Sequence, residues 1–95
     1  MEEISRSDIV ISTAGRDQGK LFYVIGTEGV YVLLANGKDR KLERPKRKKI
    51  KHVRFVTRRE SRVAEKIRTG VRVLNSELRR DLAELREDPS QNQGG

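Results

Sequence analysis

A short glycine-bounded loop holds the residues best suited to chemistry in this 95-residue chain. Residues 15–20 read Gly-Arg-Asp-Gln-Gly-Lys, and an apolar segment lies on each side of them. Glycines allow backbone N–H groups to approach an anion closely, and Arg and Lys side chains neutralise phosphate charge. The pattern therefore predicts a loop that contacts phosphate groups.

The same loop does not fit the P-loop of nucleotide hydrolases. That motif needs four residues between its glycines and a Ser or Thr after its lysine, to hold magnesium. Here three residues separate Gly15 from Gly19, and Leu21 follows Lys20. Nucleotide hydrolysis is therefore not expected.

Other catalytic and metal chemistry lacks the necessary residues. The chain has no cysteine, which excludes disulfides and thiolate metal sites, and His52 is its single histidine. A nucleophile–histidine–acid triad has no sequence support, and the carboxylates Asp8, Asp17, Glu28 and Asp39 show no acid–base spacing. We predict no catalytic residues, no metal site and no cofactor, and hence a binding protein that is not an enzyme.

The positive charge is concentrated in one segment. The formal net charge is +8, and residues 38–59 hold twelve basic and two acidic residues. Residues 1–37 hold three basic and five acidic residues, and residues 60–95 hold seven of each. A patch of this kind favours a polyanionic partner, most often nucleic acid. The alternative is a disordered or merely solvated basic loop, although the apolar Val53 and Phe55, which follow the densest part of the segment, argue against complete disorder.

Short strands are expected to position the loop and the basic segment. Runs rich in β-branched and apolar residues predict strands at 8–13, 20–26, 30–35 and 51–56, with a short one at 40–43. Asn36-Gly37 predicts a type I′ turn with positive φ at both residues, and Pro45 ends pairing or marks an edge. Residues 46–49 should then point outward, away from the core. Five short strands at this spacing predict a small barrel of SH3-like size.

The periodicity becomes helical after Thr57. Thr57 to Glu60 reads as a capping box, and Gly70 follows two basic residues as at a helix C-terminus. One long helix with an eleven-residue apolar period is the alternative. A glycine in a helix interior costs about 1 kcal/mol, so we favour two helices within 57–87, broken near 70–75. Residues 1–7 are expected to be a flexible N-terminus and 88–95 a disordered tail.

Three stretches resemble a known family. AGRDQGK, YVLLANG and KRKKIKHVRFV resemble the KOW domain of a group of archaeal and eukaryotic large-subunit ribosomal proteins. Small bacterial KOW-domain RNA-binding proteins are similar too, including a helical tail of the type RTGVRVLNSELRRDL. The resemblance covers residues 8–56 well and 57–87 loosely. It implies an SH3-like five-stranded barrel followed by helices, and a role in translation through RNA, most simply ribosomal RNA.

Together with the charge pattern, the resemblance selects the residues expected to contact RNA. These are Gly15, Arg16, Gln18, Gly19 and Lys20 in the loop, and Arg44, Lys46, Arg47, Lys48, Lys49, Lys51, His52 and Arg54 in the basic segment.

Few aromatic residues are present to support other modes of recognition. Phe22 and Phe55 are expected in the core, and only Tyr23 or Tyr31 could present a ring to a base. The multi-aromatic surfaces of RNA-recognition motifs and of SH3 peptide grooves are missing. The alternative functions are a protein-interaction or DNA-binding module in a transcription or assembly complex.

The expected location is the cytoplasm. No apolar run approaches the roughly 20 residues of a membrane span, and no apolar signal segment follows Met1. We therefore expect no membrane partner. The helical tail is expected either to pack on the barrel or to dock another protein.

Overall fold

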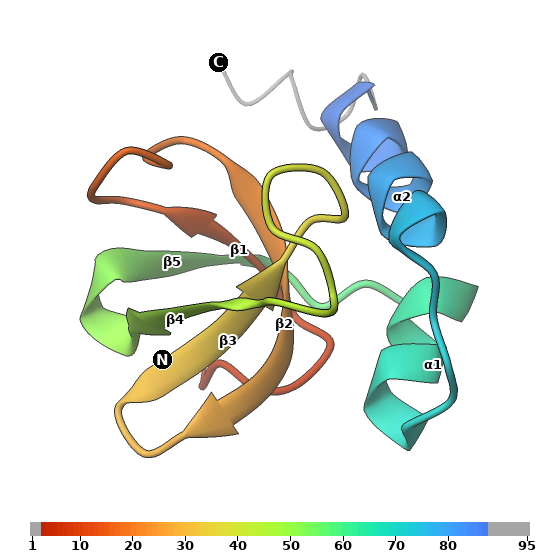
Figure 1. The fold of residues 1–95 in the computed structure, drawn as a ribbon, viewed down its shortest axis with the longest axis horizontal. Helices are drawn as coiled ribbons and strands as arrows, with labels where there is room; N and C mark the ends of the chain where they lie inside the picture. The colour runs from red at the N-terminus through yellow and green to blue at the C-terminus, as the bar shows by residue number, and fades with distance from the viewer. Residues whose placement is uncertain (1–2, 88–95) are drawn as a thin grey trace.

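A computed structural model describes residues 3–87 as a five-stranded antiparallel sheet followed by two helices (Figure 1). This confirms a mainly β fold with a helical C-terminal part. The expected disordered tail lies outside the described residues. The elements are β1 (Ile9–Ser12), β2 (Leu21–Glu28), β3 (Tyr31–Ala35), β4 (Lys46–Lys49), the 3₁₀ turn η1 (Ile50–His52), β5 (Val53–Thr57), α1 (Arg62–Thr69) and α2 (Asn75–Glu87).

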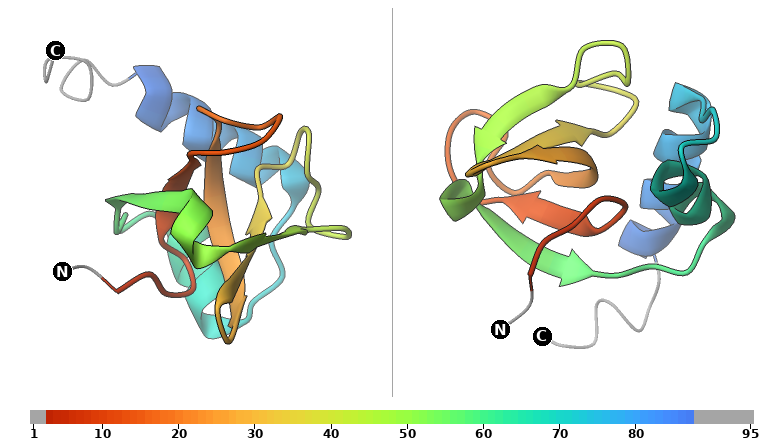
Figure 2. Two further views of the ribbon diagram at one scale, coloured as in Figure 1. Left: turned by 90° about the vertical axis from the view of Figure 1, so that its left-hand side faces the viewer. Right: turned by 90° about the horizontal axis from the view of Figure 1, so that it is seen from below.

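The strands follow the order β4-β3-β2-β1-β5, and every neighbouring pair is antiparallel. The sheet is strongly curved, and both helices lie on one side of it (Figure 2). Within residues 3–87, the edge strands β4 and β5 do not pair with each other; η1 links them along the chain. The expected closure into a barrel is therefore not seen, because the hydrogen-bonded ladder ends at these two strands.

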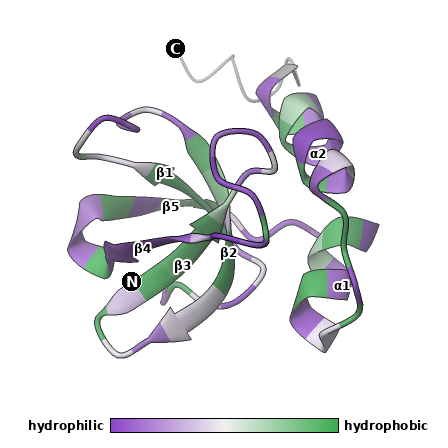
Figure 3. Cartoon of the chain, viewed as in Figure 1, coloured by the Kyte–Doolittle hydropathy of each residue, from purple (hydrophilic) through white to green (hydrophobic). Residues whose placement is uncertain are grey.

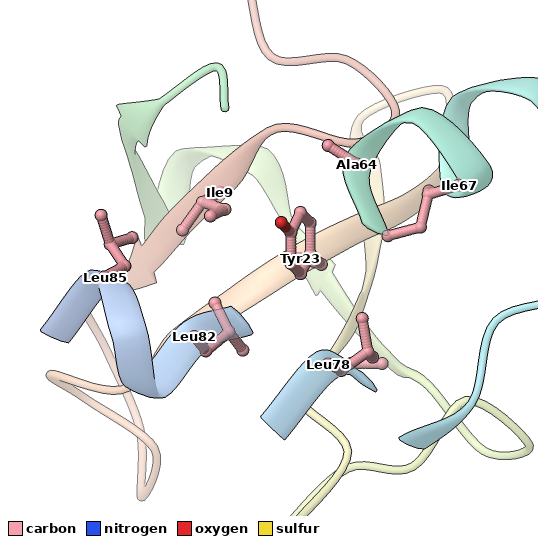
Figure 4. Close-up of a cluster of buried hydrophobic side chains, with 8 residues drawn as sticks. Ile9, Tyr23, Ala64, Ile67, Leu78, Leu82 and Leu85 are labelled. Carbon is pink, nitrogen blue, oxygen red and sulfur yellow. The ribbon is translucent and has the colours of Figure 1, made fainter. Parts of the chain in front are cut away.

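Both faces of the sheet are covered, which explains why its central strands are apolar at consecutive positions (Figure 3). Successive side chains of a strand point to opposite faces. Phe22 and Val24 thus join a cluster on the inner face, whereas Tyr23 between them faces the helices (Figure 4). The inner cluster consists of Val10, Phe22, Val24, Val32, Leu34 and Val53. The cluster under the helices consists of Ile9, Tyr23, Ala35, Ala64, Ile67, Leu78, Leu82 and Leu85.

A buried polar group connects the sheet to both helices. The Tyr23 hydroxyl contacts the Asp81 carboxylate of α2 and lies 3.1 Å from Oγ of Ser61. Ser61 caps α1 by accepting a hydrogen bond from the Ala64 N–H, and its hydroxyl lies 3.0 Å from Asp81 Oδ2. Burial and the Asp81 carboxylate raise the pKa of Tyr23 well above its ordinary value, so the hydroxyl keeps its proton.

The helical part differs from the expectation at its start. Thr57 does not cap a helix; it ends β5, where it pairs with Ile9. Pairing with β1 keeps Thr57 extended, and the helix begins only after Ser61. The two-helix prediction is confirmed, since Gly70 ends α1 in the left-handed region with φ 82°.

The connection between β3 and β4 also differs. The expected strand at 40–43 is absent, because residues 36–45 form a loop and β4 begins after Pro45. The predicted type I′ turn is wrong as well: Gly37 has φ 78°, but Ser7 is the one non-glycine residue with positive φ among residues 3–87. The Asn36 side chain organises the turn instead, since its Oδ1 accepts from the N–H groups of Lys38 and Arg40, both at 3.0 Å.

The end of the N-terminal segment is held against the sheet. The Ser7 N–H donates to the Val24 carbonyl at 2.7 Å. Asp8 is fully buried and accepts from Nε and Nη2 of Arg58 at 2.9 and 3.1 Å and from the Ser5 N–H at 2.8 Å. Residues 5–7 are thus hydrogen-bonded to β2 and to Asp8, and the flexibility expected of residues 1–7 stays a prediction.

The junction between the 36–45 loop and α2 leads to the first prediction. A Cβ atom on Gly37 would lie 2.2 Å from the Asn75 backbone oxygen, whereas one on Gly19 would have no neighbour within 4 Å. Both glycines have positive φ, so Ala at either position carries backbone strain of about 1–2 kcal/mol. Because only Gly37→Ala adds a backbone clash, it should lower the free energy of unfolding clearly more than Gly19→Ala. Urea denaturation gives the free energy of unfolding of both variants. Equal losses of stability would contradict the packing of α2 on the loop.

Candidate nucleic-acid interface

The loop at residues 13–20 is a closed, internally bonded connection between β1 and β2. Gly15 and Gly19 have φ values of 83° and 88°. The N–H groups of Gln18, Gly19 and Lys20 donate to the carbonyls of Gly15, Ser12 and Asp17, respectively. Since these three N–H groups are used within the loop, they form no nest for an anion. The glycines provide turn geometry, and the loop presents the exposed side chains of Arg16 and Lys20.

A buried ion pair fixes this loop to β4. Nζ of Lys48 lies 2.7 Å from Asp17 Oδ1 and 2.8 Å from the Ala14 carbonyl oxygen, and the Lys48 side chain is 8% exposed. Burial alone would raise the pKa of Asp17, but hydrogen bonds from Lys48 and Ser12 outweigh it and hold the pKa below its usual value. The expectation that residues 46–49 all point outward is therefore wrong for Lys48, which lies inside the fold next to the loop.

The loop at 36–45 is held by α2. The Leu42 N–H donates to Oδ1 of Asn75 at 2.8 Å, and Nη1 of Arg79 donates to the Gly37 carbonyl at 2.7 Å. Nδ2 of Asn75 also donates to the Glu43 carboxylate at 2.9 Å. The helical part thus supports the loop that faces residues 13–20.

The two loops enclose a basic depression of about 260 Å³. Lys20 and Asp39 form an ion pair across it at 3.0 Å, and both side chains are more than 40% exposed. The hydrogen bonds from Lys20 and Asn36 lower the pKa of Asp39. An exposed pair of this kind contributes little stability, so a phosphate group can replace Asp39 as the partner of Lys20. Arg16, Lys20, Arg40 and Lys46 line the depression, together with Asp17, Asp39 and Phe22.

The remaining predicted residues lie elsewhere. Lys49 and Lys51 are exposed beside the apolar Val30 and Ile50, where a second depression forms. Arg54 and Gly19 line a third depression, at the end of α2. The exposed cations of the basic segment thus line separate depressions.

Four further predicted residues lie outside those depressions. Arg47 is paired with Glu28 at 3.1 Å and lies 3.9 Å over the Tyr31 ring. His52 is half-buried, and its carbonyl accepts from the Thr13 N–H at 2.9 Å. Arg44 and Gln18 are exposed in their loops.

Two cations in these depressions were not singled out from the sequence. Arg40 lies in the basic segment, but the prediction favoured the denser run of charge at 46–49. Arg86 belongs to the charge-balanced helical part and lines the third depression only because α2 packs across β1 and β2. The charge block contained a signal for Arg40, whereas Arg86 depends on tertiary structure alone.

Comparison of the sequence with models of known protein families gave no match, and neither did comparison with curated proteins. In the part of the chain that the structure describes, no helix has the length and apolar character needed to cross a membrane. Residues 3–87 also contain no group of three or more His, Cys, Asp or Glu residues arranged to hold a metal ion. Fold and site together define a protein with a curved antiparallel β-sheet, two helices packed on one face of it, and basic loops.

The buried ion pair leads to a second prediction. Lys48→Met leaves the Asp17 carboxylate buried without its cation, which should cost about 3 kcal/mol of unfolding free energy. Lys49→Met on the same strand removes an exposed charge and should change stability by less than about 0.5 kcal/mol. The double variant Lys48→Met, Asp17→Asn should recover part of the loss. Urea denaturation of the three variants tests this, and similar stabilities for Lys48→Met and Lys49→Met would show that the pair does not hold the loop.

Acid sensitivity provides a third prediction. The pKa values of Asp8 and Asp17 are lowered in the folded protein, so both carboxylates stabilise it at pH values above about 4, their unfolded pKa. This contribution is lost as the pH falls through the unfolded value and then the lower folded values. The stability difference between wild type and Asp17→Asn should therefore be largest near pH 6 and shrink toward pH 2. Glu28→Gln, in an exposed pair, should show a small difference throughout; a constant difference for Asp17→Asn would contradict the assignment.

Proposed function

We propose that this chain is an RNA-binding module that holds the backbone phosphates of structured RNA. The observation that carries the proposal is the basic depression between the 13–20 and 36–45 loops. There, Arg16, Lys20, Arg40 and Lys46 converge from two separate parts of the sequence. Of the two carboxylates in it, Asp17 is already paired with the buried Lys48. The remaining positive charge suits a ligand with closely spaced negative groups.

The distribution of aromatic side chains favours recognition through phosphates and shape. Phe22 and Tyr23 are fully buried, and the half-buried Tyr31 ring is covered by Arg47. No broad stacking platform is therefore available on β2 or β3. Phosphate contacts position a protein on RNA, and structured RNA is read largely by shape.

The fold is compatible with the KOW resemblance at a coarse level. The curved five-stranded sheet has the glycine-bounded loop between its first two strands, and the basic residues follow on β4 and η1. We therefore propose a KOW-type, SH3-like domain acting in translation, in the cytoplasm, with ribosomal RNA as the simplest partner. The module would act by binding, without catalysis.

The helical part packs on the sheet and supports the basic loop. A protein partner for it is a further proposal. It is supported by Val71 and Leu74 between the helices, which are 56% and 50% exposed.

Salt dependence of binding tests the proposed function. In the triple variant Arg16→Gln, Arg40→Gln, Lys46→Gln, the plot of log affinity against log salt for a labelled RNA hairpin should flatten by about 2–3 units, at roughly 0.7–0.9 per phosphate contact. The matched control is Arg62→Gln, Arg72→Gln, Arg80→Gln, which removes three exposed charges from the helical part and should change the slope much less.

Parallel titrations separate the alternatives. A DNA hairpin of the same sequence and an acidic peptide should bind more weakly than the RNA. Tighter binding of DNA would favour the DNA-binding module, and tighter binding of the peptide would favour the protein-interaction module. Equal slope changes in the two triple variants would mean that charge acts diffusely and that the depression is not the site.

A further inference from the structure

The third depression, which Arg54 and Gly19 line, is a cleft of about 330 Å³ that opens where the end of α2 crosses the sheet. It lies at the open end of the core beneath the helices, where Leu85 is the last side chain of that cluster along α2 (Figure 4). Leu21, which packs against the same cluster, reaches the cleft from β2. The lining residues are Ile11, Gly19, Leu21, Arg54, Val56, Leu85 and Arg86.

The cleft combines an apolar floor with two cations. Ile11, Leu21, Val56 and Leu85 supply hydrocarbon, and none of the side chains described in the structure brings a carboxylate to the cleft. Arg54 and Arg86 are both exposed, and neither has an ion pair or side-chain hydrogen bond to another of residues 3–87. The basic depression differs, because each of its acidic residues is paired with a lysine. Guanidinium groups stack on planar rings and also bind phosphate, so this cleft suits a flat, partly apolar group that carries a negative charge.

The position of the cleft connects it to the proposed RNA site. Gly19 lines the cleft, and the next residue, Lys20, lines the basic depression. Leu21 lines the cleft again, whereas Phe22 lies fully buried beneath the depression. Gly19 has no side chain, and even an added Cβ would meet nothing within 4 Å. A strand of RNA that passes over this loop therefore has an open path from one recess to the other.

We infer that the cleft receives one unpaired nucleobase of the bound RNA, with Arg54 or Arg86 stacking on the base or holding its phosphate. This inference rests on the proposed function and extends it to the kind of RNA selected. A volume of about 330 Å³ is near the lower end for ligand pockets, which fits one planar group. In a continuous A-form helix the bases stay stacked, and side chains cannot read the deep major groove. The protein consequently selects RNA that contains a bulged or looped-out nucleotide.

Two RNA hairpins that differ by a single bulged nucleotide test the inference. The wild-type protein should bind the bulged hairpin about tenfold more tightly, as expected for stacking of one base. The variant Arg54→Gln, Arg86→Gln should bind both hairpins equally. A second variant, Val56→Asn, alters only the apolar wall and should also reduce the preference. The matched control Arg62→Gln, Arg72→Gln leaves the cleft intact and should keep it.

A fluorescent 2-aminopurine at the bulge gives a readout of the base itself. Its emission should change when wild-type protein binds and should stay at the free-RNA value with the Arg54→Gln, Arg86→Gln variant at saturating concentration. Urea denaturation verifies that each variant is folded.

The outcomes separate this inference from the proposed function. If the unbulged hairpin binds with a steep salt dependence and the bulge adds nothing, the phosphate site stands and the nucleobase pocket is refuted. The pocket is also refuted if the double variant keeps the preference for the bulged hairpin. If neither RNA binds, while an acidic peptide binds the wild type and loses affinity for the Arg54→Gln, Arg86→Gln variant, both proposals fail and the cleft belongs to a protein interface.

Discussion

The Lys48–Asp17 ion pair determines where the basic surface forms. It joins an edge strand to a loop 31 residues earlier in the chain, and both side chains are largely buried. Removing charges from water is costly unless geometry and hydrogen bonds compensate. Here the Ser12 hydroxyl donates to Asp17 Oδ1 and Lys48 donates to the Ala14 carbonyl, whereas Asp17 Oδ2 is buried without a partner among the described residues. Strand pairing connects Lys20 to Lys46 through β2 and β3, and the ion pair adds a direct link between the loop that bears Arg16 and β4. One lysine of the run KRKK therefore has a structural role, and its neighbours remain available to a ligand.

The helices contribute to the same surface from behind. Tyr23, Ser61 and Asp81 fix both helices to β2, and Asn75 and Arg79 then hold the 36–45 loop. The helical part therefore fixes the position of basic residues that belong to another segment of the chain. It is coupled to the proposed binding site through packing, even though residues 60–95 together have no net charge.

Much of the fold could be predicted from local sequence. Val10, Val24 and Val32 lie in apolar runs that turn residues interrupt, and Gly70 indicated the helix end that the structure has. The strand β4 could not be predicted, because Lys and Arg are poor strand formers and its stability comes from pairing with β3 and from Asp17. The helix cap was misplaced because Thr57 is more strongly bound by β1 than by its capping-box neighbours. The contribution of the 13–20 loop to the basic depression was predictable. Arg86 reaches the cleft at the end of α2 through packing that no local sequence pattern encodes.

The two edges of the sheet have a consequence for the behaviour of the free protein. An unpaired strand exposes a row of backbone donors and acceptors that can template the addition of a strand from another molecule, and lysines along an edge suppress this. Here β4 consists of Lys-Arg-Lys-Lys, and Arg54 and Arg58 lie on β5 and directly after it. Two copies that approach through these edges bring like charges together, which opposes self-assembly of the sheet. At 0.1 M salt this repulsion acts over only about 10 Å. The protection against self-association is therefore greatest at low ionic strength.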